Sequence, residues 1–273
     1  MPNTRDMTTL APFDESPLWE VARTGQYRGK VANLGWMFCR RDNGWLNTST
    51  VQDVAHYLDG SQASINPVVL GTPYYLVSTS ASDGVGGTGI RSVRVNCLTG
   101  ALGVRTIRTI TLNGTTPVLL GDDVQFVQYM ESDAVGSVGV AVGNVYCSSK
   151  SIAGTPTVPE RIDMIGPGDG RSMAGRVMVP DSFKLHLMGW HVNAISANMD
   201  TRIRGTVFTN DRTLSAGYHF QDTAYVASGQ SFVDEFHYAT FPAGAIIKLS
   251  AIPSAAAAGN RCEGSFHFLL VQD

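Results

Sequence analysis

The chain has 273 residues, which is enough for one large domain or for two of ordinary size. Hydrophobic residues make up 43% of it, so it can form real cores and does not have the composition of a disordered chain. Only 16% of the residues are charged and the net charge is −3, so the chain lacks the basic footprint that nucleic acid or an anionic membrane would require.

Residues 1–65 differ in pattern from the rest of the chain. Little regular periodicity is visible there, except at residues 51–58, where apolar residues recur at the spacing of a short helix. The segment also carries Trp19, Trp36, Phe38 and Trp45. Such large rings either line the edge of the chain's own domain or dock onto a neighbouring subunit, because aromatic residues are enriched in interface cores. We expect an irregular N-terminal arm.

Residues 66–158 have the pattern of a first β-domain. Short apolar or β-branched runs are separated by glycine, proline, asparagine and aspartate, and Asn113-Gly114 is a strong two-residue turn signal. The domain ends at the linker-like segment 154–159. Strands are expected at residues 74–79, 90–96, 104–112, 117–120, 124–130 and 144–147.

Residues 159–273 have the pattern of a second β-domain, with one strand about every ten residues. The last of these alternates, with Cys262, Phe266 and Phe268 on one face and polar residues on the other, which is typical of an antiparallel sheet. We predict an all-β fold of two antiparallel sandwich-like or jelly-roll-like domains that follow the arm. Strands are expected at residues 173–179, 183–192, 201–209, 214–220, 231–236, 245–252 and 262–271.

No stretch of the chain has the roughly 20 consecutive apolar residues that span a bilayer. The first residues are also not followed by the apolar core of a secretion signal, so we expect folding in a cytoplasm. The four cysteines, Cys39, Cys97, Cys147 and Cys262, show none of the short spacings of a structural zinc site. We therefore interpret all four as reduced thiols.

The sequence contains no recognisable catalytic constellation. A Gly-x-Ser-x-Gly motif is missing, and His186 and His191 are five apart in a predicted strand, which should place them on opposite faces. The glycine-rich runs 83–91 and 166–171 are followed by β-patterned sequence rather than by a helix, so hairpin loops are favoured over phosphate-binding loops. The sequence leaves open a pair of carboxylates that converge from distant strands. We expect a non-enzyme without catalytic residues, metal or cofactor.

Three segments resemble a family of tailed-bacteriophage virion structural proteins. They are residues 78–83 (STSASD), 86–95 (GGTGIRSVRV) and 111–118 (TLNGTTPV), and the last is the most specific. Weaker likeness continues through the glycine-rich loop at 168–174 and the block 241–249 to the C-terminus. The resemblance covers the chain from about residue 20.

The resemblance implies a protein that is assembled into the particle in the cytoplasm of the host bacterium. A capsid decoration, or cement, protein that bridges shell subunits is the first interpretation, and a tail or fibre-tip component that binds host glycans is the alternative. The partners would be the major capsid protein or other virion proteins, and a homotrimer on a three-fold axis would multiply the contacts. Neither nucleic acid nor a membrane is expected as a partner.

The partner contact is predicted in the N-terminal arm. Arginine and tryptophan are typical anchors of interfaces, so the predicted contact residues are Trp19, Trp36, Arg40, Arg41 and Trp45. On this interpretation a chain without residues 1–60 should still fold as a β-protein but no longer bind shells. In the alternative, Trp190 or Tyr218 would stack on a sugar.

Overall fold

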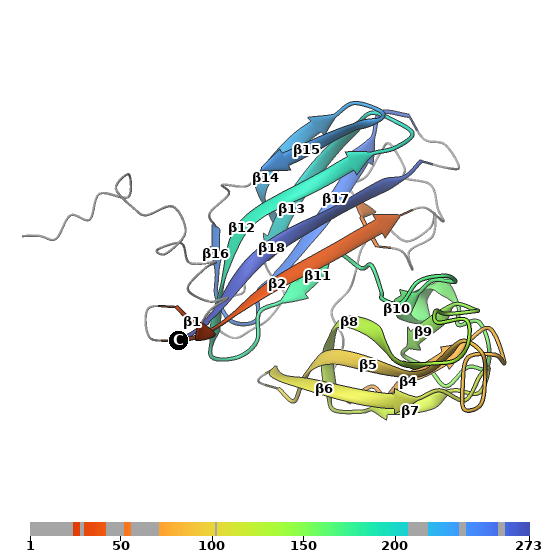
Figure 1. The fold of residues 1–273 in the computed structure, drawn as a ribbon. Coiled ribbons are helices and arrows are strands. Elements are labelled where there is room, and N and C mark those ends of the chain that lie inside the picture. Colours follow the sequence, from red (N-terminus) through yellow and green to blue (C-terminus); the bar gives the residue numbers. More distant parts are fainter. Residues whose placement is uncertain are drawn as a thin grey trace, which may run out of the picture.

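The computed structural model describes residues 24–27, 30–41, 52–55, 71–101, 103–206, 218–234, 239–255 and 260–273. This part of the chain is all-β in small antiparallel sheets, as predicted, with one short 3-10 helix, η2 (Val158–Glu160). No helix in these ranges has the length and hydropathy to cross a membrane. The described strands form two groups, which we call the first and the second unit (Figure 1).

The first unit consists of two sheets that share one hydrophobic core. A four-stranded sheet has the order β10-β9-β4-β7, and a three-stranded sheet has the order β6-β5-β8. Buried residues of both sheets, among them Leu76, Val95, Val127 and Cys147, form this core. The strands are β4 (Tyr74–Ser78), β5 (Ile90–Thr99), β6 (Val104–Thr111), β7 (Val118–Gly121), β8 (Val124–Val135), β9 (Val145–Ser148) and β10 (Arg161–Ile165).

The second unit also has two sheets around one core. The six-stranded sheet runs β1-β2-β18-β12-β15 with β16 beside β12, and the five-stranded sheet runs β11-β17-β13-β14 with β3 beside β17. The strands are β1 (Gln26–Tyr27), β2 (Lys30–Arg41), β3 (Gln52–Asp53), β11 (Arg176–Met178), β12 (Phe183–Ala194), β13 (Met199–Thr206), β14 (Tyr218–Val226), β15 (Gln230–Asp234), β16 (Ala239–Phe241), β17 (Ile246–Pro253) and β18 (Cys262–Gln272).

The predicted alternation of the last strand is confirmed. Cys262, Phe266 and Phe268 of β18 point into the core of the second unit, together with Trp190 of β12 and Leu249 of β17. These five side chains are at most 3% exposed. The apolar period of two therefore defines which face of the six-stranded sheet meets the five-stranded sheet.

The N-terminal segment contributes regular strands to the second unit rather than an irregular arm over its described residues. The 12-residue strand β2 pairs with β18 from Ala32 to Arg41. The helix predicted at residues 51–58 is wrong over residues 52–55, because Gln52 and Asp53 pair with β17. The spacing of apolar residues resembled one face of a helix, but Val54 and Ala55 are buried in two different cores and do not share a face.

The buried pair Asp53–Lys248 holds β3 in place. The two side chains are 0% exposed and their charged atoms, Oδ2 and Nζ, are 2.6 Å apart. The Ser250 hydroxyl donates a hydrogen bond of 2.8 Å to the other carboxylate oxygen. Removal of residues 1–60 would eliminate this pair and β2, so we now expect the shortened chain to lose the second unit, not only its partner contact.

The division into an arm and domains at 66–158 and 159–273 stays a prediction, but strand pairing adds detail to it. The strand β10 pairs with β9 of the first unit, although it lies beyond the predicted linker 154–159. The composition of residues 154–159 suggested a domain linker, but the end of this segment is an ordered turn. The Glu160 carboxylate accepts hydrogen bonds there from the backbone N–H and the hydroxyl of Thr157. The jelly-roll topology likewise stays a prediction.

A β-bulge in β12 reverses one expectation about its histidines. The register with β18 shifts between Leu187 and Gly189, so that Leu185 and Leu187 before the bulge and Trp190 after it all enter the core. His186 and His191 therefore lie on the same, outer face of the sheet rather than on opposite faces. The strict period of two cannot reveal such an inserted residue.

Candidate functional site

A row of large apolar side chains lies exposed on the outer face of β2. Met37 and Cys39 point into the core, and the alternate residues Leu34, Trp36 and Phe38 point outward. Their exposed fractions are 37%, 52% and 44%. We call these three residues the outer row. Large exposed apolar residues that adjoin one another are typical of an interaction surface, whereas single ones are ordinary.

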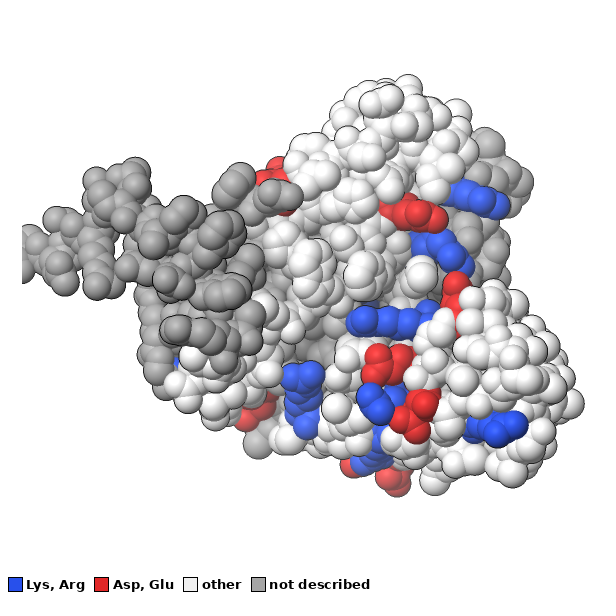
Figure 2. Space-filling model, in the orientation of Figure 1, with Lys and Arg blue, Asp and Glu red and all other residues white. Residues whose placement is uncertain are grey.

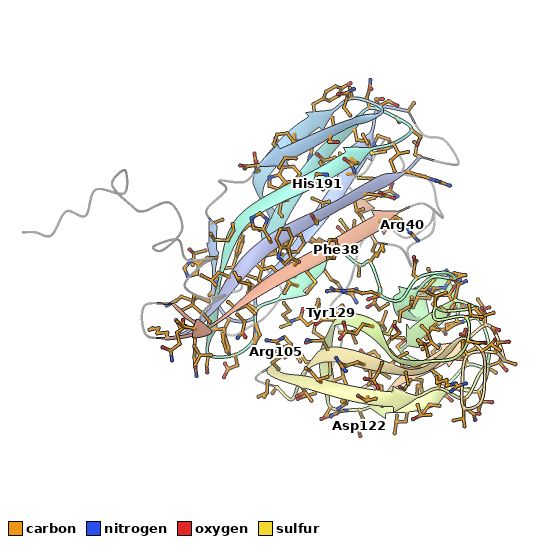
Figure 3. All side chains as sticks on the ribbon, viewed as in Figure 1. Phe38, Arg40, Arg105, Asp122, Tyr129 and His191 are labelled. Atoms are coloured by element: carbon orange, nitrogen blue, oxygen red, sulfur yellow. The ribbon has the colours of Figure 1, made fainter. Side chains whose placement is uncertain are left out.

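Histidines of the neighbouring strands extend the outer row into a wider surface. The ring of Trp36 stacks on His267 of β18 with a centroid distance of 4.6 Å. Beyond Phe38 there is an open hollow of about 280 Å³, lined among others by Arg40, His191 and Ser265. Figure 3 shows Phe38, Arg40 and His191 on this face. The surface thus combines exposed rings with polar groups at its border, as interface cores and their rims do.

The first unit meets β2 through Arg171, which lies between two aromatic rings. Its guanidinium carbon is 4.1 Å from the ring centre of Tyr129 and 5.6 Å from that of Phe38. The same guanidinium donates a hydrogen bond of 3.3 Å to the Trp36 carbonyl. Planar contact of arginine with aromatic faces is favourable, so Arg171 joins the outer row to the first unit.

The glycine-rich loop 166–171 has a structural task at this junction. Asp169 forms an ion pair of 2.8 Å with Arg40, and both side chains are largely buried, at 16% and 22% exposure. The segment that follows the loop then pairs with the edge of β2, because Gly175 N–H donates to the Phe38 carbonyl and Arg40 N–H to the Met173 carbonyl. The sequence-based preference for a hairpin loop over a phosphate-binding loop agrees with these contacts.

Deeper contacts fix the two units to each other. Arg176 of β11 is 2% exposed and donates to the carbonyls of Val127 and Ile162 in the first unit. The Gln128 side chain forms two hydrogen bonds with the backbone of Met178, at 2.6 and 3.0 Å. Figure 2 shows charged side chains over this junction, while the visible surface of the second unit is mostly uncharged. Buried hydrogen bonds thus make the junction a closely bonded joint.

Asp163 is the most perturbed carboxylate near this joint. Desolvation by complete burial raises its pKa to about 6, against the opposing influence of Arg176 and a hydrogen bond from Ser172. Ser172 accepts a bond from the Met130 N–H in turn. The carboxylate connects β10 to the loop that reaches β2, which is a structural role.

Asp83 organises residues 78–91 of the first unit. Its buried carboxylate accepts hydrogen bonds from the Ser78 hydroxyl and from the backbone N–H groups of Ile90, Val142 and Gly143, at 2.7 to 3.0 Å. Through these hydrogen bonds, Asp83 connects residues 78–83 and 86–90 to the loop before β9. The buried carboxylate therefore shapes a loop of the first unit.

The structure places the five predicted contact residues differently. Trp36 is exposed in the outer row, whereas Arg40 is engaged with Asp169. Trp19 and Trp45 lie outside the described residues, and so does the side chain of Arg41. Sequence reasoning missed Leu34, Arg171 and Tyr129, although the alternation from residue 34 to 39 was a signal for Leu34, and it named Phe38 only among the large rings of the N-terminal segment.

No arrangement of three or more histidine, cysteine or acidic residues suited to a metal is found among the described residues. All four cysteines are free and buried, and burial raises the pKa of Cys39, Cys97 and Cys147 above the ordinary thiol value. These thiols are protonated at neutral pH and are poor nucleophiles.

The prediction that Trp190 stacks on a sugar is wrong. Its ring is 1% exposed and packs beside Phe232, and its indole N–H donates to Asp222. An aromatic residue in strand context is as suited to a core as to a surface, so its type alone was no guide. The side chain of Tyr218 lies outside the described residues.

Comparison with known proteins yields only distant similarity. Neither a protein-family profile nor a curated protein matches the chain. Among solved structures, a chain of the infectious bursal disease virus Gx strain is 11% identical, with a TM-score of 0.22 over 89% of this chain and 71% of that one. The VP2 subviral particle of the same virus is 12% identical, with a TM-score of 0.19 over 89% and 72% of the two chains. Values this low assign the chain to no family.

Proposed function

We propose that the chain is a structural component of a tailed-phage virion and acts as a decoration protein that bridges shell subunits. The sequence segments that resemble such proteins suggest the particle, and the outer row suggests the mode of action. Leu34, Trp36 and Phe38 expose large apolar side chains on a regular strand, where no flexible loop has to be ordered on binding. The outer row carries the proposal.

The bonded joint supports a bridging role. A protein that reinforces a shell must transmit load between the surfaces it contacts, and Arg176 and Gln128 tie the two units together through buried hydrogen bonds. A standard stable interface buries about 1,600 Å² in total, so several copies, as in the proposed homotrimer, would add contact area around a symmetry axis. Such a protein acts without turnover.

The test is co-sedimentation of the full-length protein with shells of its phage that lack it. We expect Trp36→Ala to weaken binding at least 10-fold, since truncation of an aromatic anchor commonly costs about 2 kcal/mol or more. Tyr225→Ala is the matched control, because Tyr225 is an aromatic residue of β14 in the other sheet and is 69% exposed. Equal binding of the Trp36 and Tyr225 variants, or no binding of the wild type, would contradict the proposal.

Glycan binding at a tail or fibre tip is the second candidate, and the free part of the Trp36 ring is the observation that favours it. One side of this ring stacks on His267, yet half of the residue is exposed. A glycan array with wild-type protein and the Trp36→Ala variant separates the two candidates. Binding to a host glycan that the variant loses, together with unchanged shell binding, would favour the second.

A further inference from the structure

The backbone edge of β2 is open between two paired ends. Gln26 and Tyr27 of β1 pair only with the beginning of β2, and Ala32 N–H donates to the Gly25 carbonyl. At the other end, the Phe38 carbonyl and the Arg40 N–H bond to the segment at residues 173–175. Between these ends, the Trp36 carbonyl accepts a hydrogen bond from the side chain of Arg171.

The unpaired groups in this gap can be assigned from the strand geometry. The edge bonds of Ala32, Phe38 and Arg40 show that even-numbered residues of β2 direct their N–H and C=O groups away from β18. Leu34 N–H, Leu34 C=O and Trp36 N–H therefore face the gap, and in the described part of the chain no hydrogen bond reaches them. The gap from Ala32 to Trp36 is about 14 Å long at the usual rise of a strand.

The gap opens into a cleft of about 230 Å³ between β2 and the first unit. This volume is below the roughly 300–1,000 Å³ of typical small-molecule pockets, so it fits a narrow extended backbone better than a compact ligand. Asn33 and Leu34 lie on one side of the cleft, and Asn96 and Tyr129 lie on the other. Figure 3 shows Tyr129 and Arg105 in the region between β2 and the strands of the first unit.

The charge of the cleft is positive. Arg105 and Arg171 are the charged residues among the described side chains that line it. Arg105 is exposed and has no ion-pair partner in the described ranges. The buried Nε atom of Arg171 also lacks a hydrogen-bond acceptor there. A carboxylate in the cleft would therefore meet a positive charge, and Arg105 has no ion-pair partner of its own in the described ranges.

We propose that this cleft is a strand-acceptor site, which binds an extended segment of a partner protein with a carboxylate side chain. The segment pairs with Leu34 and Trp36 through its backbone and places its carboxylate at Arg105, so that main-chain bonds give affinity and the charge gives selectivity. This inference goes beyond the proposed function, because it concerns the isolated protein and uses the backbone of Leu34 and Trp36, not the side chains of the outer row and not a particle.

The test is fluorescence anisotropy of the full-length protein with a fluorescein-labelled heptapeptide of alternating valine and threonine around a central aspartate. We expect saturable binding that falls at least 10-fold when the same peptide is N-methylated at alternate residues, since methylation removes the paired N–H groups. Replacement of the central aspartate by asparagine should weaken binding at least 5-fold. These two comparisons leave the fold of the protein untouched.

Three protein variants complete the test. Arg105→Gln should reproduce the effect of the asparagine peptide. Arg261→Gln, at an arginine that is also exposed and lies directly before the first residue of β18, should leave binding unchanged. Leu34→Pro removes an N–H that forms no bond with β18, so it should weaken binding while β2 stays paired. Absence of saturable binding, or equal affinity for the methylated and unmethylated peptides, would overturn the strand-acceptor site. Loss of shell binding in Trp36→Ala with peptide binding intact would separate this site from the proposed function.

Discussion

Asp53→Asn should destabilise the second unit more than any substitution of a surface ion pair. Asp53 and Lys248 are both 0% exposed and 2.6 Å apart, so the substitution leaves an ammonium group buried without its counter-charge. Breaking a buried pair from one side costs about 3–5 kcal/mol. That is a large part of the roughly 5–15 kcal/mol by which folded domains are stable.

The chain offers a matched control for this prediction. Lys184 and Asp273 form an ion pair of the same type and the same 2.6 Å length, but their side chains are 52% and 45% exposed. Asp273→Asn should cost at most about 1 kcal/mol because solvent screens this pair. Urea unfolding at pH 7 compares the two variants, and a second comparison uses Asp53→Asn combined with Lys248→Met, which removes both charges and should restore much of the loss. Equal unfolding free energies for Asp53→Asn and Asp273→Asn would refute the reasoning.

Two further predictions concern packing and pH. Gly35→Ala should destabilise the protein by about 1–3 kcal/mol in urea unfolding, because a Cβ atom there would lie 2.3 Å from the Phe268 ring; Gly170→Ala, where the nearest atom is 3.3 Å away, should change little. Equal effects would contradict the packing argument. Burial raises the pKa of Asp163 from 3.8 to about 6, so the folded protein holds this proton more tightly than the unfolded chain does. Relative to Asp163→Asn, the wild type should therefore lose about 3 kcal/mol of stability as the pH rises from below 4 to above 6. A difference between the two proteins that is independent of pH would contradict the shift.

Local patterning predicted the strands well where every second residue shares one face of a sheet. The alternation in β18 is such a case, since one face of this strand meets a core. The short strand β3 could not be predicted, because two residues define no period and its pairing with β17 joins positions about 200 apart in the chain. The bulge in β12 was invisible for a related reason, since only the partner strand reveals an extra residue.

The contact surface could be predicted only in part. The abundance of tryptophan drew attention to Trp36, and exposure confirms that this ring is accessible. The engagement of Arg40 by Asp169 and the contacts of Arg171 with Tyr129 depend on the packing of the two units, over separations that no local pattern encodes. Residue type alone likewise could not distinguish the buried Trp190 from the exposed Trp36.

An electron-microscopy reconstruction of the purified phage particle tests the central claim most directly. The proposed role predicts density for the chain at symmetry-equivalent positions, with Leu34, Trp36 and Phe38 packed against another virion subunit. Particles without the chain, or a bound chain whose outer row faces solvent at every position, would contradict it.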